Sequence, residues 1–422
     1  MATQTDLPFS GDTPPTSSAP VSPLAAEVAG LRALQANDDH AGALSGAIRL
    51  LEGEPTNRDL LLIAAHSLRM TQRTDEAFAM LDRLAQHHPQ FSQLFLERGL
   101  CHVARRDAPA AISDLRVAVM LNTALLMGWH MLVGLYRMTG DAKSAEVAAK
   151  HVAHLTSVPP PIVQAKVLFG DGEVDEAEMQ IRRFLLEFGD HPEAMRLLAQ
   201  IGHMRNVLDD AETLYAGVLA MVPDHYEARR EYVQVLISRH KFPQAREALE
   251  PLLKVDPAAH PHRIQAATIQ VGLGDFEGAI PDYRAMLGEI PGDSPSARLR
   301  RSDLNLWLGH ALKTEGRTAE AIEAYMAATA DRPDFGDAWW SLANLKTYVF
   351  TDEDLDRLRT AEARNDLQDL DRVYLGFARG KALEDRRAYS ESWASYARAN
   401  ALRRSANLYR PEVSEACVER LK

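Results

Sequence analysis

The stretch Gly336–Lys346, which reads GDAWWSLANLK, gathers residue types that could bind a ligand. Two adjacent tryptophans offer large aromatic faces, and the amide of Asn344 can both donate and accept hydrogen bonds. Such a combination suits the binding of an extended polypeptide. The alternative is ordinary packing, in which Trp339 and Trp340 fill the interior of a helical protein. The choice between the two depends on the helices that carry these residues.

Elsewhere the sequence lacks the short motifs that mark common catalytic sites. It contains no phosphate-binding G-x4-G-K-[ST] loop, no G-x-S-x-G elbow and no H-E-x-x-H pair. Three histidine pairs could be considered as metal ligands, but none is accompanied by a cysteine or a carboxylate cluster. We therefore expect loop or surface histidines, with no catalytic residue, no metal and no cofactor in this chain. The pairs are His87 with His88, His151 with His154, and His260 with His262.

The composition narrows the class of partner. Lysine and arginine total 47 and aspartate and glutamate total 59, so the net charge of −12 argues against a general nucleic-acid binder. Two cysteines, Cys101 and Cys417, are too few and too far apart for a disulfide framework. No apolar run is long enough to span a membrane, and no signal peptide opens the chain. We expect a cytoplasmic protein whose Ser-, Thr- and Pro-rich residues 1–22 are disordered.

The elements that carry the candidate residues repeat every 34 residues. The chain shows pairs of short amphipathic helical patterns rich in Ala and Leu, and strand signals are nearly absent. The spacing falls to 32 around "SVPPP" (157–161), and it rises to 42 around "GDSPSARLRRSD" (292–303). Such regularity is typical of a repeat architecture. The small residues that mark the period are Ala43, Ala77, Ala111 and Ala145, then Ala177, Ala211, Ala245 and Ala279, then Ala321.

A helix–turn–helix period of 34 residues resembles the tetratricopeptide repeat, whose signature is W-x2-L-G-x2-Y, then A-x3-F, then P. Trp129, Leu132 and Tyr136, followed by Ala145, match this signature. The resemblance implies an all-α fold, an α-solenoid whose helix pairs form a right-handed superhelix. Small residues would let the paired helices approach closely, while large apolar residues one turn away would fill the space beside them.

In the repeat family that the chain resembles, the first helix of each repeat lines a concave groove, and its positions 5, 9 and 12 point there. Trp339 then takes position 4, in the core, while Trp340 and Asn344 face the groove. The groove positions are polar and mostly basic, so we predict that they bind a protein or extended peptide, acidic ones included. A solvated polar face is the alternative. The predicted groove residues are Arg196, Gln200, His203, Arg230, Gln234, His310, Lys313, Trp340 and Asn344, preceded by His66, Arg69, His130 and Arg137.

Residues 337–404 resemble the segment that joins the repeats to the catalytic domain in bacterial tetratricopeptide-repeat sulfotransferases. The resemblance rests on "DAWWSLANLKT" (337–347), "FTDEDLDRLRTAEA" and "YLGFARGKALEDRRAYSESWASYARANALRR" (374–404). It implies a full-length relative whose α/β domain binds the sulfate donor 3′-phosphoadenylyl sulfate (PAPS) through a P-R-S-G-[ST]-T-like loop. No such motif occurs here, so no catalytic residue is carried over, and the chain is expected to be the N-terminal portion of such a protein.

Three functions remain open from the sequence. The first is a non-catalytic scaffold that presents a partner or acceptor, the second is part of a PAPS-dependent sulfotransferase, and the third is a freestanding adaptor. The expected plan is a disordered tail (1–22), an array of about nine repeats (23–335), degenerate repeats and linker helices (336–404), and a helix (405–422) leading to an absent domain. In that last helix Val413, Cys417 and Leu421 would be exposed or would pair with a second copy of the chain, which makes a homodimer one alternative.

Overall fold

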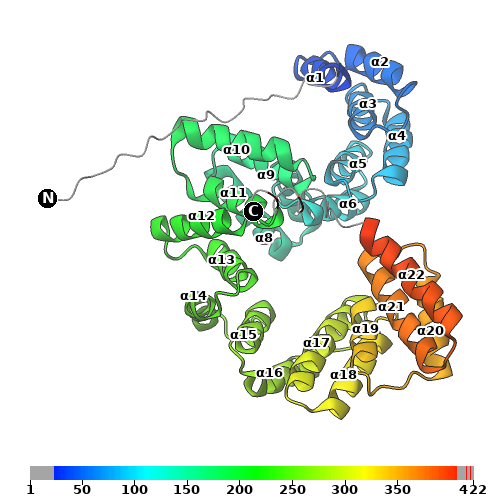
Figure 1. Cartoon of the computed structure of the whole chain (residues 1–422). Helices are drawn as coiled ribbons and strands as arrows, with labels where there is room; N and C mark the ends of the chain where they lie inside the picture. The colour runs from blue at the N-terminus through cyan, green and yellow to red at the C-terminus, as the bar shows by residue number, and fades with distance from the viewer. Residues whose placement is uncertain (1–22, 406–414, 416–418, 420–422) are drawn as a thin grey trace. The chain divides into compact units, whose positions relative to one another are not determined.

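The computed structural model describes residues 23–405 together with residues 415 and 419, and within them all regular structure is helical. The all-α solenoid of helical repeats predicted from the sequence is thereby confirmed (Figure 1). The predicted disordered tail (1–22) and nearly all of the predicted last helix (405–422) lie outside the described residues. No described helix is both long and apolar enough to cross a membrane.

The chain divides into two compact units, residues 1–201 and residues 202–422, and the division falls within helix α11. The first unit is built from successive antiparallel helix pairs. Its helices are α1 (Pro23–Ala36), α2 (His40–Leu51), α3 (Arg58–Met70), α4 (Thr74–His87), α5 (Ser92–Ala104), α6 (Ala108–Leu121), α7 (Leu126–Thr139), α8 (Ala142–Ser157), α9 (Pro160–Gly170), α10 (Val174–Phe188) and most of α11 (Pro192–Met204).

The second unit continues the same pairing as far as residue 331, and beyond it the helix Gly336–Asn344 packs against the helix Asp369–Asp385. Its helices are α12 (Leu208–Met221), α13 (Tyr226–Ser238), α14 (Phe242–Val255), α15 (His260–Gly272), α16 (Phe276–Glu289), α17 (Pro295–Thr314), α18 (Thr318–Asp331), α19 (Gly336–Asn344), α20 (Asp352–Glu362), α21 (Asp369–Asp385) and α22 (Tyr389–Ser405). The residues inserted near 292–303 do not form a long loop. They become the first turns of α17, which Ser294 caps by accepting a hydrogen bond from the backbone of Ala297 at 3.2 Å.

The period appears in the backbone as well as in the sequence. The first helix of most pairs ends at a residue with positive φ, the left-handed conformation that commonly closes a helix. Glycine adopts this conformation at Gly140, Gly172 and Gly274, and residues with a side chain, which adopt it less readily, do so at the other positions. Each position lies 34 residues from the next except across the "SVPPP" segment, where the step from Gly140 to Gly172 is 32. The residues are Asp38, Gln72, Arg106, Gly140, Gly172, Asn206, His240 and Gly274.

Close helix approach explains the small residues of the repeat. Each alanine that marks the period is at most 5% exposed. The glycine at position 8 serves the same purpose, because a Cβ on Gly309 would lie 2.5 Å from the Tyr325 ring, and one on Gly99 would lie 2.7 Å from Leu115. Tyr325 and Leu115 are themselves fully buried. The small residues of the repeat signature are therefore explained by close packing between the two helices of a pair.

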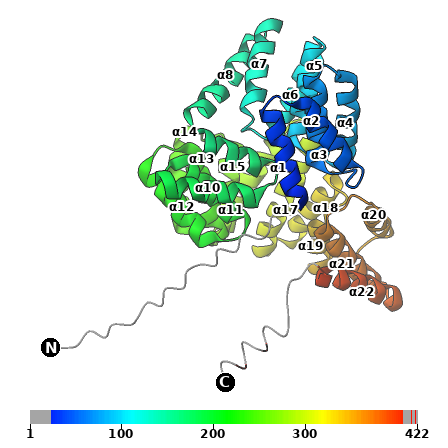
Figure 2. The same ribbon diagram turned by 90° about the horizontal axis from the view of Figure 1, so that it is seen from above.

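The shortened step at 157–161 changes the packing of the repeat that follows. Pro160 and Pro161 begin α9, which is only 11 residues long. The buried side chain of Asn122, at the end of α6, donates from Nδ2 to the Val167 carbonyl oxygen at 2.8 Å and packs against Gly170. Helix α9 thus contacts the end of α6, while α7 and α8 pack against each other as the intervening helix pair (Figure 2).

Candidate functional site

A small polar pocket lies among the first helices of three successive pairs in the first unit. These helices, α1, α3 and α5, run side by side, with α2, α4 and α6 packed behind them (Figure 1). The pocket has a volume of about 140 Å³. Its walls combine two anions, two cationic or titratable groups and two amides with two aliphatic side chains. The lining residues are Arg32, Gln35, Asp59, Leu62, Ile63, His66, Gln93 and Glu97.

Glu97 is the most buried charge in this pocket, at 6% exposure. Its carboxylate accepts hydrogen bonds from the Arg69 guanidinium and from His66 Nδ1, the latter at 3.2 Å. Burial by itself raises the pKa of Glu97, but these two donors outweigh it and hold the pKa below its ordinary value. One turn further along α5, burial and the neighbouring Glu97 raise the pKa of the Cys101 thiol to about 12. Cys101 is therefore a neutral, buried thiol rather than a nucleophile.

The other polar walls are held by contacts between helices. Gln35 on α1 donates from Nε2 to the Ile63 carbonyl oxygen at 3.0 Å and to Ser67 Oγ at 2.9 Å. Arg32 on α1 forms an ion pair with Asp59 on α3 at 3.0 Å, yet 57% of the Arg32 side chain stays exposed. The guanidinium of Arg32 is thus the accessible cation at the edge of the pocket.

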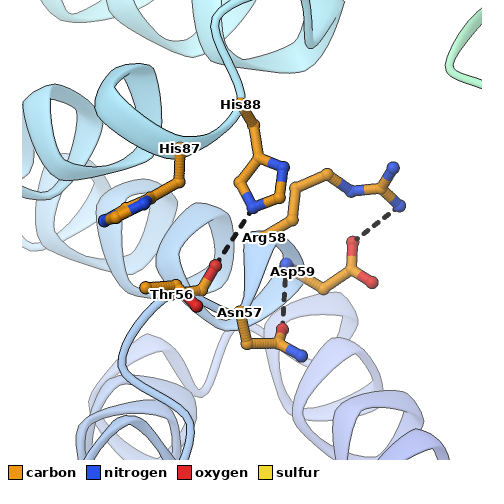
Figure 3. A pocket seen from close by; sticks show the side chains of 6 residues that line it. All are labelled: Thr56, Asn57, Arg58, Asp59, His87 and His88. Carbon is orange, nitrogen blue, oxygen red and sulfur yellow. Dashed lines mark hydrogen bonds and ion pairs between the residues drawn. The ribbon is translucent and has the colours of Figure 1, made fainter. Parts of the chain in front are cut away.

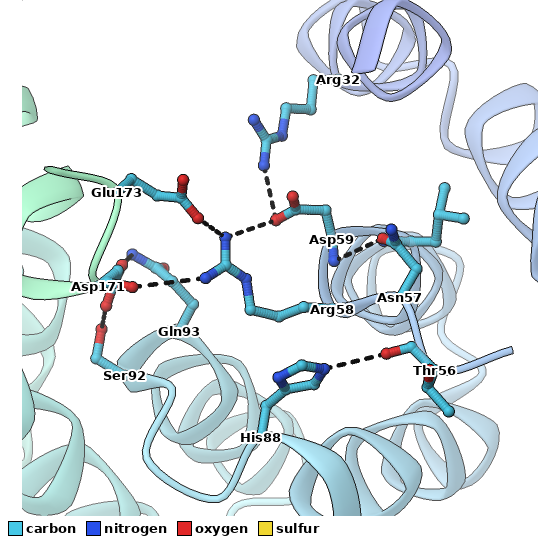
Figure 4. Close-up of polar contacts among 11 residues, drawn as sticks. Arg32, Thr56, Asn57, Arg58, Asp59, His88, Ser92, Gln93, Asp171 and Glu173 are labelled. Carbon is cyan, nitrogen blue, oxygen red and sulfur yellow. Dashed lines mark hydrogen bonds and ion pairs between the residues drawn. The ribbon is translucent and has the colours of Figure 1, made fainter. Parts of the chain in front are cut away.

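A second polar cluster begins where this pocket ends (Figure 4). Arg58, the first residue of α3, forms ion pairs with Asp59 and with Glu173, which lies in the turn between α9 and α10. The carboxylate of Asp171, in the same turn, accepts hydrogen bonds from Ser92 Oγ and, at 3.2 Å, from Gln93 Nε2. Asp59 and Gln93 therefore belong both to the pocket and to this cluster.

A more open hollow lies beside the cluster, at the turns that precede α3 and α5 (Figure 3). His88 donates from Nε2 to the Thr56 carbonyl oxygen at 3.0 Å, which ties the two turns together. Asn57 caps α3, because its Oδ1 accepts from the backbone nitrogens of Asp59 and Leu60, each at 3.1 Å. His87 also lines the hollow. The described residues contain no group of three or more His, Cys, Asp or Glu side chains that could hold a metal ion.

One histidine of each remaining pair packs against an aromatic side chain. His151 stacks on the Trp129 ring with centroids 4.0 Å apart, and Trp129 Nε1 donates to the Thr123 carbonyl oxygen at 2.9 Å. His262 is 1% exposed, and its Nε2 lies 2.7 Å from Tyr226 Oη. The expectation of loop or surface histidines is therefore wrong for His262, which is buried between α13 and α15.

The predicted groove residues on α11 and α13 are mostly engaged with neighbouring side chains. Arg196, whose side chain is 14% exposed, lies 3.5 Å from Glu193, and Gln200 is half-buried. His203 lies 3.4 Å from Ser238 Oγ. Arg230 pairs with Glu227 at 3.0 Å, whereas Gln234 is exposed. Their role in binding remains a prediction.

On α17 and α19 the predicted residues divide between packing and exposure. His310 Nδ1 lies 2.9 Å from Tyr325 Oη, while Lys313 is exposed. Trp340 is half-buried against Phe377, with ring centroids 5.5 Å apart, and Asn344 is exposed at the end of α19.

Trp339 lies in the core, as its repeat position predicts. It is fully buried, and its Nε1 donates to the Pro333 carbonyl oxygen at 2.9 Å. The Arg357 guanidinium lies 4.8 Å from the centroid of its ring. An open hollow of about 690 Å³ adjoins this contact, and Arg357 reaches from its wall to the Thr329 carbonyl oxygen at 2.9 Å. The hollow is lined by Pro333, Asp334, Glu353, Asp356, Arg357, Thr360, Ala361 and Arg364.

Sequence reasoning found only part of the pocket on α1, α3 and α5. His66 lines it and Arg69 binds its buried carboxylate, and both were predicted from positions 9 and 12 of their repeat. Arg32 and Gln35 hold the same two positions one repeat earlier, and Asp59 and Gln93 hold position 2 of theirs. Extending the count to the first repeat and to position 2 would have found them. Glu97 could not be found in this way, because its repeat position is none of those counted toward the groove. Its side chain contacts His66 and Arg69 on α3.

Comparisons with known proteins agree with the repeat. Residues 162–226 and 307–345 match one family model described as a tetratricopeptide repeat, and residues 207–268 match another with the same description. Residues 162–268 and 307–345 are thus similar to tetratricopeptide repeats. Neither match supports the sulfotransferase relation expected from residues 337–404. A search of curated proteins finds no match.

Two solved repeat structures illustrate the similarity. A tetratricopeptide repeat protein from Parabacteroides merdae is 14% identical, with a TM-score of 0.40, over 68% of this chain and 99% of its own. MamA from Desulfovibrio magneticus RS-1 is 15% identical, with a TM-score of 0.35, over 41% of this chain and 95% of its own.

Proposed function

We propose that the protein is a scaffold that binds a polypeptide partner, and that an extended segment of the partner lies against α1, α3 and α5. The observation that carries the proposal is the convergence of polar side chains from three successive repeats on one pocket. Packing of the repeat requires small and apolar residues only, and a buried carboxylate such as Glu97 costs stability unless it is paired. A polar pocket maintained in this way is better explained by binding than by folding.

The size of the pocket favours a peptide over a small molecule. Sites for drug-sized ligands occupy roughly 300–1,000 Å³, and this pocket measures about 140 Å³. It suits one side chain of a longer ligand. The amides of Gln35 and Gln93 and the guanidinium of Arg32 are the groups that hold peptide backbone and carboxylates. The partner is therefore expected to place a polar or acidic side chain here.

The test is a selection of 12-residue peptides from a display library on the full chain, followed by affinity measurements on the selected peptides. Arg32→Ala and Gln93→Ala should each weaken binding by about tenfold, the loss typical of one charged or well-placed hydrogen bond. Arg73→Ala serves as the matched control, because Arg73 forms an exposed ion pair with Glu76 at 2.7 Å on α4. Equal affinities for all three variants and the wild type would contradict the proposal.

The residues predicted on α11, α13 and α17 are further candidates for partner binding. Arg196→Ala, Arg230→Ala and Lys313→Ala should each reduce capture of the selected peptides if the substituted side chain takes part. Unchanged capture by all three would show that these side chains belong to a solvated polar face.

A relation to sulfotransferases is supported only by the resemblance of residues 337–404, and PAPS would then be the cofactor of the full-length relative. Calorimetric titration of the chain with PAPS separates the two functions. Saturable heat would support an enzymatic role for this chain, and its absence would leave the scaffold as the function. The small number of cysteines supports a cytoplasmic location, which cell fractionation would test.

A further inference from the structure

One contact in the first unit departs from the behaviour of repeat arrays. Repeats normally contact only their neighbours in the chain. The turn between α9 and α10 instead reaches the beginnings of α3 and α5, and Glu173 is 115 residues from its partner Arg58. Figure 4 shows the turn entering between the two helices.

Five residues form hydrogen bonds with one another at this point. Arg58 binds the Glu173 carboxylate, and its Nη1 lies 3.5 Å from the Asp171 carbonyl oxygen. Ser92 Oγ and Gln93 Nε2 donate to the Asp171 carboxylate. In these contacts α3 and α5 supply only hydrogen-bond donors, and the turn supplies only acceptors. Two of the acceptors are the carboxylates of Asp171 and Glu173, which are separated by Gly172.

The receptor side of this contact is preorganised without the turn. The Arg58 guanidinium lies 4.5 Å from the centroid of the Phe91 ring, and its Nη2 lies 3.5 Å from Asp59. The Arg58 side chain is 22% exposed, so it is held near the surface. Ser92 and Gln93 open α5, where the free backbone nitrogens of the first turn add positive potential.

The turn itself is partly exposed at its tip. Asn122 anchors the helix that carries it through the Val167 carbonyl oxygen and Gly170, and this anchor does not involve residues 171–173. The Glu173 side chain is 45% exposed. Ion pairs with such exposure are weak and are screened by salt. The tip can therefore leave the two helices while α9 stays in place.

We infer that Arg58, Ser92 and Gln93 form a receptor for an extended acidic segment, and that the chain's own residues 171–173 occupy it. An acidic segment of a partner polypeptide displaces this turn and gains the same donors. Because Asp59 and Gln93 also line the pocket of about 140 Å³, displacement would change that pocket at the same time. The inference rests on the proposed function in one respect, namely that the partner polypeptide binds along α1, α3 and α5.

The experiment uses the full chain and a fluorescein-labelled peptide of sequence Gly-Asp-Gly-Glu-Gly, which copies the turn. In the wild type the tethered turn competes at an effective concentration that is in the millimolar range for short tethers. Asp171→Ala/Glu173→Ala removes this competitor, so fluorescence anisotropy should show at least tenfold tighter peptide binding than in the wild type. Adding Arg58→Ala to the double variant should abolish the gain.

Three controls make the result specific. The peptide Gly-Asn-Gly-Gln-Gly should bind at least tenfold more weakly, and Arg73→Ala/Glu76→Ala should bind the acidic peptide as weakly as the wild type does. If Asp171→Ala/Glu173→Ala lacks the helical circular dichroism of the wild type, Asp171→Asn/Glu173→Gln replaces it. No gain in a folded double variant, or a gain that survives Arg58→Ala, would overturn the inference. Either result leaves the Arg32→Ala readout of the peptide selection free to succeed or fail separately, because Arg32 does not contact the turn, whereas Gln93→Ala reports on both sites.

Discussion

At the scale of single residues, the most consequential charge is Glu97. Its carboxylate is buried and paired with Arg69 and His66, so it is stable only in the ionised form. A carboxyl group whose pKa is lowered on folding stabilises the protein above its unfolded pKa, and this stabilisation disappears as the pH falls through the folded value. The pocket on α1, α3 and α5 should therefore be sensitive to acid.

We predict that Glu97→Gln lowers the free energy of unfolding at pH 7 by about 1–3 kcal/mol, the cost of leaving buried partners unsatisfied. The difference from the wild type should shrink as the pH falls below the ordinary pKa of glutamate, about 4.3, because Glu97 of the unfolded wild type then binds a proton that the folded protein, with its lowered pKa, takes up only at lower pH. Urea unfolding at a series of pH values measures it. The exposed Glu187 on α10 supplies the control, since Glu187→Gln should match the wild type throughout. A constant difference down to pH 3 would contradict the prediction.

At the scale of the helix, the repeat depends on where each helix ends. Gly140 closes α7 with a φ of 81°, and Gly134 lies within the same helix, with nothing near the place of an added Cβ in either case. The two glycines therefore differ in backbone conformation alone. Alanine avoids the left-handed region but favours the helix interior.

Substitution of glycine by alanine should thus change the free energy of unfolding in opposite directions at the two sites. Gly140→Ala should destabilise the protein by about 1 kcal/mol through left-handed strain, and Gly134→Ala should stabilise it by about 0.5–1 kcal/mol through reduced chain entropy. Thermal and urea unfolding of the two variants provide the comparison. If both changes shift stability in the same direction, the helix end is not set by this residue.

The shortened step at 157–161 also acts at this scale. Two residues fewer than the period are enough to begin α9 early and to bring Gly170 against Asn122. The contact of the following turn with α3 and α5 depends on this local change. A helix pair of ordinary length would carry that turn elsewhere.

At the scale of the whole molecule, we expect local stability to differ from one helix pair to the next. In a repeat array each pair is stabilised chiefly by its neighbours, so the effect of a substitution fades with distance along the sequence. The contacts of the turn at 171–173 with α3 and α5, and of Asn122 with Val167, are exceptions among the described residues of the first unit.

We predict that Gly309→Ala, which forces a Cβ toward Tyr325, lowers amide hydrogen-exchange protection most in α16 to α19. Overpacking of this kind costs about 1–3 kcal/mol. Protection in α1 to α6 should change little. Gly288→Ala in α16 is the control, because nothing lies near its added Cβ. An equal loss of protection throughout the chain would mean that the array unfolds as one cooperative unit.

The sequence by itself determined the helical period, the helix pairs and the core positions. Ala43 and its equivalents, Trp339 and Gly309 could be assigned because they are local consequences of the way two adjacent helices pack. It also located the two breaks in the period, although it did not indicate that residues near 292–303 would extend α17.

Only the tertiary structure decided which polar residues meet. Glu97 meets His66 and Arg69 because α5 packs beside α3, and Arg58 meets Glu173, 115 residues away in the sequence, because the turn after α9 lies against the beginning of α3. Such contacts depend on side-chain packing at many helix interfaces, and no single segment of the sequence encodes them. The period therefore predicted the helices, while the polar pocket and its neighbouring turn came from the way the helices pack in three dimensions.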